Sequence, residues 1–150
     1  MKVILTSLTR QEKLFTLADA DWFPLEVVKA GDVTATAGLR CLDAASWSLS
    51  GRLRVTLVLS CDRCGRQLLW PVDDQFVYRV AVEESGGQGG EVDEENAALW
   101  LVSGPALDLS EVFRERIFLV SPEKVLCAET CRGLCAGCGA DLNLEPCRCP

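Results

Sequence analysis

The sequence contains no histidine, one methionine and one tyrosine among its 150 residues. The absence of histidine excludes hydrolases whose general base is an imidazole. No apolar stretch approaches the ~18 residues that a membrane-spanning helix needs. The opening residues 1–15 hold only a short apolar patch that charged residues soon interrupt, which is a poor secretory signal. We therefore expect a cytoplasmic, reducing location, no membrane partner and no small-molecule substrate.

Basic residues are absent between Arg79 and Arg114, and within this interval residues 83–95 hold six acidic residues and four glycines. This composition predicts a mobile, solvated loop. The net charge of the chain is −7, which disfavours long-range attraction of nucleic acid. The apolar content of 49% and the charged content of 25% are otherwise those of a globular protein with a hydrophobic core.

Cysteine, by contrast, is abundant, with nine residues in the chain. Eight of them form closely spaced sets: Cys61, Cys64, Cys127, Cys131, Cys135, Cys138, Cys147 and Cys149. Closely spaced thiolates can chelate Zn²⁺ in a tetrahedral structural site, and Gly65 and Gly139 let the backbone curl around the sulfurs. In a reducing compartment such cysteines favour metal over disulfides, so we predict one or two structural zinc ions. The ninth, Cys41, is expected to be a small buried side chain.

Two groupings of these cysteines provide four ligands for an ion. In the first, the four cysteines of residues 135–149 close one site, and Cys61 and Cys64 join Cys127 and Cys131. In the second, a zinc-ribbon arrangement, the Cys-x-x-Cys pair of the hairpin shares an ion with the Cys-x-x-Cys pair of the tail. The short spacing within the tail favours the first grouping. The remaining alternative is a protein without metal, which leaves eight reactive thiols.

Alternating apolar and polar residues predict an antiparallel sheet. The predicted strands are residues 3–5, 13–17, 31–39, 47–59 and 76–82, with a buried strand over 97–102. Alternation is clearest over Trp47–Leu59, where Gly51 falls in the apolar series and predicts a bulge or bend. The Cys61–Gly65 segment then lies at the tip of a long hairpin. Trp22 and Phe23 are expected in the core rather than at a binding site.

A capping box from Asp108 to Glu111 predicts the start of a helix over residues 108–120, with Glu111 reaching back to the first amide. Apolar residues recur at helical spacing along it, so one side should cover a face of the sheet. Arg116 falls within this apolar stripe, and its guanidinium is expected to reach the rim. The fold class is α+β: an antiparallel β-rich sheet, one amphipathic helix and a cysteine-rich, zinc-binding C-terminal tail. We expect a single domain over 1–150, with a body of residues 1–126 and a tail of residues 127–150.

Five of the 15 basic residues cluster on the predicted hairpin. They are Arg52, Arg54, Arg63, Arg66 and Arg79. This cluster is a candidate RNA-binding patch. The alternative is a solvated sheet face whose arginines pair with carboxylates across strands.

Three segments of the chain are distinctive together: CDRCG at 61–65, DLSEVFRERIFLVSP at 108–122 and CRGLCAGCGADLNLEPCRC at 131–149. This combination resembles the YceD family of large ribosomal RNA subunit accumulation proteins. The resemblance implies a cytoplasmic, non-enzymatic protein that helps large-subunit, 23S-type ribosomal RNA to accumulate. The chain departs from the family pattern at Ala136, where the family often has proline.

The leading hypothesis is therefore a zinc-stabilised, non-catalytic factor. Its expected partner is large-subunit rRNA or a pre-50S particle, bound directly or through a ribosomal protein. The alternative is a zinc-ribbon adaptor between proteins, with no ribosomal role. A redox enzyme is disfavoured because Gly65 leads into a strand, whereas a reactive Cys-x-x-Cys lies at a helix N-terminus.

Overall fold

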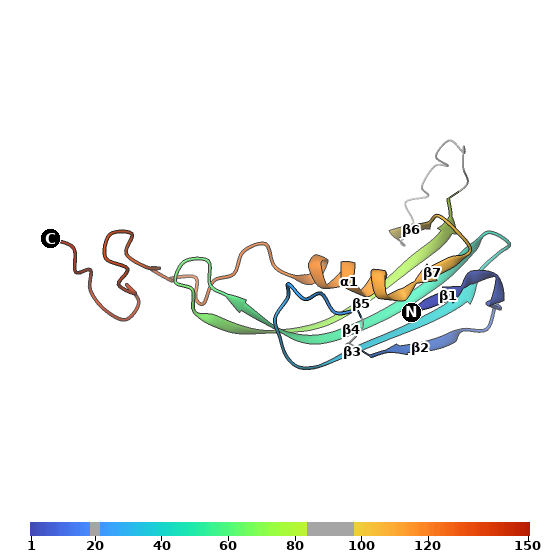
Figure 1. Cartoon of the computed structure of the whole chain (residues 1–150), viewed down its shortest axis with the longest axis horizontal. Coiled ribbons are helices and arrows are strands. Elements are labelled where there is room, and N and C mark those ends of the chain that lie inside the picture. Colours follow the sequence, from blue (N-terminus) through green and yellow to red (C-terminus); the bar gives the residue numbers. More distant parts are fainter. Residues whose placement is uncertain (19–21, 84–97) are drawn as a thin grey trace.

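The computed structural model describes residues 1–18, 22–83 and 98–150, which form an elongated molecule with the tail at one end (Figure 1). Its elements are β1 (Lys2–Ile4), a 3-10 turn (Leu5–Ser7), β2 (Lys13–Leu17), β3 (Lys29–Cys41), β4 (Ser46–Ser60), β5 (Gln67–Val82), β6 (Ala98–Val102), β7 (Ala106–Asp108) and α1 (Leu109–Val120). This confirms the predicted class of a mostly antiparallel sheet with one helix. The acidic stretch expected to be mobile lies almost wholly in 84–97, outside the described residues.

The main sheet has five strands in the order β2-β3-β4-β5-β6, and β1 and β7 pair separately. Strands β2 to β5 are antiparallel neighbours, whereas β6 runs parallel to β5. The β4/β5 hairpin is the longest feature, and its register continues from Ser46↔Ala81 to Ser60↔Gln67 without a shift. The strand predicted over 47–59 and the hairpin that follows it are confirmed.

The core lies between α1 and one face of the sheet (Figure 1). The buried side of α1 consists of Leu109, Val112, Phe113 and Ile117. The Phe113 ring packs edge-on against Phe76 of β5, with 5.6 Å between ring centroids, and 5.5 Å from the Trp22 ring. Trp22 is only 1% exposed, which confirms its prediction as a core residue.

Helix α1 begins as predicted, with Asp108 as its N-cap accepting a hydrogen bond from the Ser110 amide at 2.9 Å. The described contacts include no bond from Glu111 back to the Asp108 amide. The prediction that Arg116 reaches the rim is wrong. Its guanidinium donates to Asp74 of β5 at 2.7 and 2.8 Å, where the two side chains are 18% and 17% exposed. The carboxylate on the helix-facing side of β5 is what lets this arginine stay within the apolar stripe.

Strand β5 begins at Gln67, well before the predicted residue 76, because Pro71 and two aspartates hide the alternation. The Cys61 amide donates to the Arg66 carbonyl at 2.8 Å. From this pair onward, opposing residues along the hairpin alternate between pairs that are hydrogen-bonded to each other and pairs that are not. The backbone groups of Leu69 and Pro71 therefore point away from β4, and the missing N–H of proline costs no ladder bond. Because β6 pairs only with residues 78–82, residues 67–77 form an open edge in the described part of the chain.

The prediction of a buried strand over 97–102 is wrong in its burial. Leu99 and Leu101 of β6 are 43% and 55% exposed. Strand β6 is the last strand of the described sheet on this side. The two leucines lie on the face of the sheet that points away from α1, so the helix does not cover them. Cys41 is half-buried rather than buried. No helix in the described ranges combines the length and the apolar character needed to cross a membrane.

Gly51 does not mark a bulge or bend, because pairing continues unshifted through it on both sides of β4. A Cβ atom at this position would overlap the ring of Phe76 on the neighbouring strand. The glycine therefore leaves space for an aromatic ring that packs beneath α1.

We expect Gly51→Ala to lower the free energy of unfolding by about 1–3 kcal/mol, the usual cost of overpacking a core. The measurement is chemical denaturation followed by circular dichroism. Gly104→Ala is the matched control, because a Cβ atom there has no heavy atom within 4 Å. Equal stability of the two variants would contradict the packing role of Gly51.

Candidate metal centres

The first cysteine pair lies in a tight turn at the tip of the β4/β5 hairpin. Gly65 has a φ of 72°, and its amide donates to the Cys61 carbonyl at 2.8 Å. Burial alone would raise the pKa of the Cys61 thiol, but backbone amides of Cys127, Arg63 and Cys64 donate to its sulfur and lower the pKa to about 6. The Cys61 thiolate is thus stabilised jointly by the amide of Cys127 in the tail and by the amides of the turn itself.

The second pair repeats this turn in the tail. Gly139 has a φ of 71°, and its amide donates to the Cys135 carbonyl at 2.8 Å. The backbone amides of Cys138 and Gly137 hold the pKa of Cys135 at about 6. Both turns have the sequence Cys-x-x-Cys-Gly, in which only the glycine readily adopts the left-handed conformation.

The eight cysteines gather into two groups of four, and within each group all sulfurs lie within 4.8 Å of one another. The proximal centre is Cys61, Cys64, Cys127 and Cys131. The terminal centre is Cys135, Cys138, Cys147 and Cys149. This is the first of the two groupings considered from the sequence. The zinc-ribbon grouping, with the two Cys-x-x-Cys pairs on one ion, is not the arrangement found.

The sulfur spacing in both groups suits a tetrahedral metal ion. In the proximal centre the Cys61–Cys131 and Cys64–Cys127 sulfurs are 3.8 and 3.6 Å apart. In the terminal centre the Cys135 sulfur is 3.4 Å from the Cys147 sulfur and 3.7 Å from the Cys149 sulfur. Zinc–sulfur bonds of about 2.3 Å in a tetrahedron place sulfurs about 3.8 Å apart. Either group could hold a metal ion, and four thiolates leave no open position for a reacting water.

The crowding of sulfurs has an electrostatic cost when no cation lies between them. The Cys131 sulfur, burial and the other two sulfurs of the proximal centre together raise the pKa of Cys127 to about 12. In the terminal centre the Cys147, Cys135 and Cys138 sulfurs raise the pKa of Cys149. A divalent cation would relieve this repulsion by neutralising the thiolates.

The proximal centre joins the tail to the hairpin tip, and polar contacts surround it. Asp62 and Val125 exchange two hydrogen bonds: the Asp62 amide donates to the Val125 carbonyl at 2.8 Å, and the Val125 amide donates to the Asp62 carboxylate at 2.7 Å. The Arg63 guanidinium donates to the Cys131 carbonyl at 2.7 Å. A Cβ atom at Gly133 would lie 2.9 Å from the Arg63 carbonyl oxygen, so glycine permits this close approach. No sequence pattern indicates the role of Asp62, which lies between two cysteines and had no predicted partner.

The terminal centre is built from the tail alone and extends beyond the hairpin tip (Figure 1). Cys147 and Cys149 are exposed, whereas Cys61 and Cys131 of the proximal centre are 3% and 4% exposed. The two centres therefore share their ligand chemistry but differ in shielding from solvent.

The arginines of the candidate RNA patch all have partners within the protein. Arg52 donates to Asp73 at 2.9 and 2.8 Å, and Arg54 donates to the same carboxylate at 3.1 Å. The Arg52 guanidinium, with a smaller contribution from Arg54, lowers the pKa of Asp73 to about 2. The other three pairs are Arg79 with Asp43, Arg66 with Asp141, and Arg63 with the Cys131 carbonyl. RNA binding by this patch stays a prediction.

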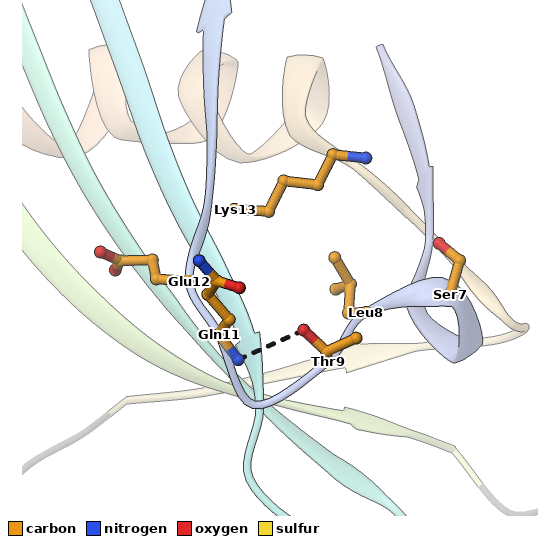
Figure 2. Close-up of a pocket in the computed structure, with 6 residues that line it drawn as sticks. All are labelled: Ser7, Leu8, Thr9, Gln11, Glu12 and Lys13. Atoms are coloured by element: carbon orange, nitrogen blue, oxygen red, sulfur yellow. Dashed lines mark hydrogen bonds between the residues drawn. The ribbon is translucent and has the colours of Figure 1, made fainter.

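A depression of about 310 Å³ lies near the N-terminus (Figure 2). It is lined by Ser7, Leu8, Thr9, Gln11, Glu12 and Lys13. The Gln11 amide donates to the Thr9 hydroxyl at 3.3 Å, and only Glu12 and Lys13 carry charge. These side chains do not converge on one point (Figure 2), so they give no support for a catalytic site.

Metal content tests the centres directly. The wild-type protein, purified without chelator, should carry about two zinc ions, because two groups of four thiolates are available. Cys64→Ser and Cys138→Ser should each reduce the content to about one by disabling one centre. Elemental analysis measures the metal, and Cys41→Ser, outside both groups, is the control. Metal-free wild-type protein with all thiols titratable would contradict the assignment.

The family model described as large ribosomal RNA subunit accumulation protein YceD matches residues 49–150. The matched range runs from within β4 to the end of the chain and includes all eight cysteines of the two centres. No curated protein and no solved structure gives a significant match. Since the match covers more than half of the 150 residues, the chain belongs to the YceD family.

Proposed function

We propose that this protein is a non-enzymatic factor that promotes the accumulation of large-subunit, 23S-type ribosomal RNA, with structural zinc at the proximal and terminal centres. The observation that carries the proposal is the family match, which spans the hairpin, α1 and both centres. The protein acts in the cytoplasm on large-subunit rRNA or a pre-50S particle, directly or through a ribosomal protein. Body and tail, 1–126 and 127–150, work as a single domain because the proximal centre takes ligands from both.

The chemistry of the cysteines supports a structural role for the metal. Each centre offers four sulfurs, which complete a tetrahedron and leave no position for a substrate or an activated water. The sequence has no histidine to act as general base near them. Zinc therefore contributes to the order of the tail rather than to a reaction.

The charge distribution supports the hairpin as the RNA-facing element. Residues 46–82 hold five arginines and three aspartates, whereas residues 83–95 hold six acidic residues and no basic one. Most of the net charge of −7 therefore comes from one segment, and the hairpin itself is positive. Arg52 and Arg54 share a single carboxylate, so this cluster keeps one uncompensated positive charge for a phosphate.

The alternative of a protein–protein adaptor has one observation in its favour. Leu134 and Leu144 of the tail are 49% and 76% exposed; the first precedes Cys135, and the second lies in the loop between Cys138 and Cys147. Exposed leucines on a metal-ordered tail suit contact with another protein. Capture of tagged protein from cells, with RNA and protein both identified, separates the two functions.

Removal of the protein from cells should lower 23S rRNA relative to 16S rRNA, and the tagged protein should sediment with large-subunit precursors. Northern hybridisation and gradient sedimentation measure the two effects. Cys64→Ser protein should rescue poorly, because the tail loses its attachment to the hairpin. An unchanged ratio of 23S to 16S rRNA after removal would reject the ribosomal function.

The arginine patch is tested by two substitutions with opposite expected effects. Arg52→Gln with Arg54→Gln should weaken association with large-subunit rRNA several-fold and flatten its salt dependence, because phosphate contacts are lost. Asp73→Asn should strengthen the association, because it frees both guanidinium groups from their carboxylate.

Filter binding at several salt concentrations gives the affinities. Asp73 is 48% exposed, so Asp73→Asn should leave the fold intact. If Asp73→Asn leaves RNA affinity unchanged, the arginines serve only to pair the strands, as the alternative interpretation of the sequence holds.

A further inference from the structure

Asn143 belongs to the tail loop of the terminal centre but contacts the proximal one. In sequence it lies between Cys138 and Cys147, which are both ligands of the terminal centre. Its side-chain amide nevertheless donates to the Cys131 sulfur at 3.5 Å. Cys131 is 4% exposed, so this contact lies at the shielded centre.

The orientation of the Asn143 amide is fixed by its other two partners. Its oxygen accepts a hydrogen bond from the Arg132 backbone amide at 2.8 Å. Its nitrogen donates to the Asp141 carboxylate at 2.7 Å. A rotated amide would place N–H against N–H and oxygen against carboxylate, so the nitrogen must face the sulfur.

The loop that carries Asn143 is closed by the terminal centre. Residues 139–146 join Cys138 to Cys147, whose sulfurs lie within 4.8 Å of each other. The loop buries no large apolar side chain: Leu144 is 76% exposed, Leu142 is half-buried, and only the small Ala140 is fully buried. Burial cannot offset the entropy of ordering such a segment, so its order comes from backbone hydrogen bonds to residues 133 and 135 and from ligation at its two ends.

We propose that the two centres bind metal cooperatively, with Asn143 as the positioning residue through which the terminal centre strengthens the proximal one. The inference rests on the metal binding proposed above. Four thiolates around a divalent ion carry excess negative charge, and an N–H bond to one sulfur disperses that charge. Because coupling between binding sites is reciprocal, metal at the proximal centre strengthens the terminal centre by the same factor.

The test uses full-length protein loaded with cadmium-113, whose two resonances report the two centres separately during titration with EDTA. Cys138→Ser assigns the resonances by removing the terminal one. Asn143→Ala should weaken the proximal centre about tenfold, the usual effect of losing a hydrogen bond to a metal ligand. Asn143→Asp should weaken it more, because a carboxylate replaces the donor beside the thiolates. Leu144→Ala is the matched control and should leave the proximal affinity unchanged.

A second comparison tests the coupling itself. The double variant Cys147→Ser, Cys149→Ser empties the terminal centre and should weaken the proximal centre by a similar factor. Adding Asn143→Ala to this background should cost little more, since the loop is already released. Losses that multiply, or an Asn143→Ala protein with wild-type proximal affinity, would overturn the coupling while metal binding stands. A wild-type protein without cadmium resonances would instead overturn the metal centres.

Discussion

The meeting of four sulfurs at the hairpin tip is the constraint on which the arrangement of this protein depends. Two of the sulfurs come from the turn between β4 and β5, and two come from the chain after α1, more than 60 residues later. The sheet and α1 have their own apolar core, but the tail buries few large side chains. The paired hydrogen bonds between Asp62 and Val125 fix where the tail meets the hairpin tip, which brings Cys127 and Cys131 to the cysteines of that turn.

Local patterns in the sequence predicted the elements whose signal is local. Strict alternation located β4, the capping residue Asp108 located the start of α1, and the short cysteine spacing favoured the grouping that the sulfurs adopt. The predictions failed for residues whose environment is set by a partner distant in the sequence. Gly51 was predicted to be a bulge because its partner, the Phe76 ring, lies on another strand. Arg116 was predicted to reach the rim because no local pattern indicates its partner Asp74 on β5. Asn143 carries no signal at all, because its contact with Cys131 exists only once the tail has folded back.

The predicted RNA patch illustrates a limit of reading charge from sequence. Clustered arginines on one hairpin suggested an open basic surface, but Asp73 takes up two of them across the strands. Conversely, the net charge of −7 predicted weak long-range attraction of nucleic acid, although six of the acidic residues belong to the single segment 83–95. A net charge or a count of arginines therefore says less about binding than the pairing of individual charges, because screening limits the reach of a charge to about 10 Å.

The proline in the open edge of β5 has a consequence for how copies of this protein meet. An unpaired strand edge is a template on which another chain can add a strand, and repeated addition leads to aggregation. At Pro71 the group that an incoming strand would need is missing, and a rigid ring occupies its place. Pro71 therefore disfavours the addition of another strand at this part of the edge, close to the hairpin tip that carries the first two cysteines.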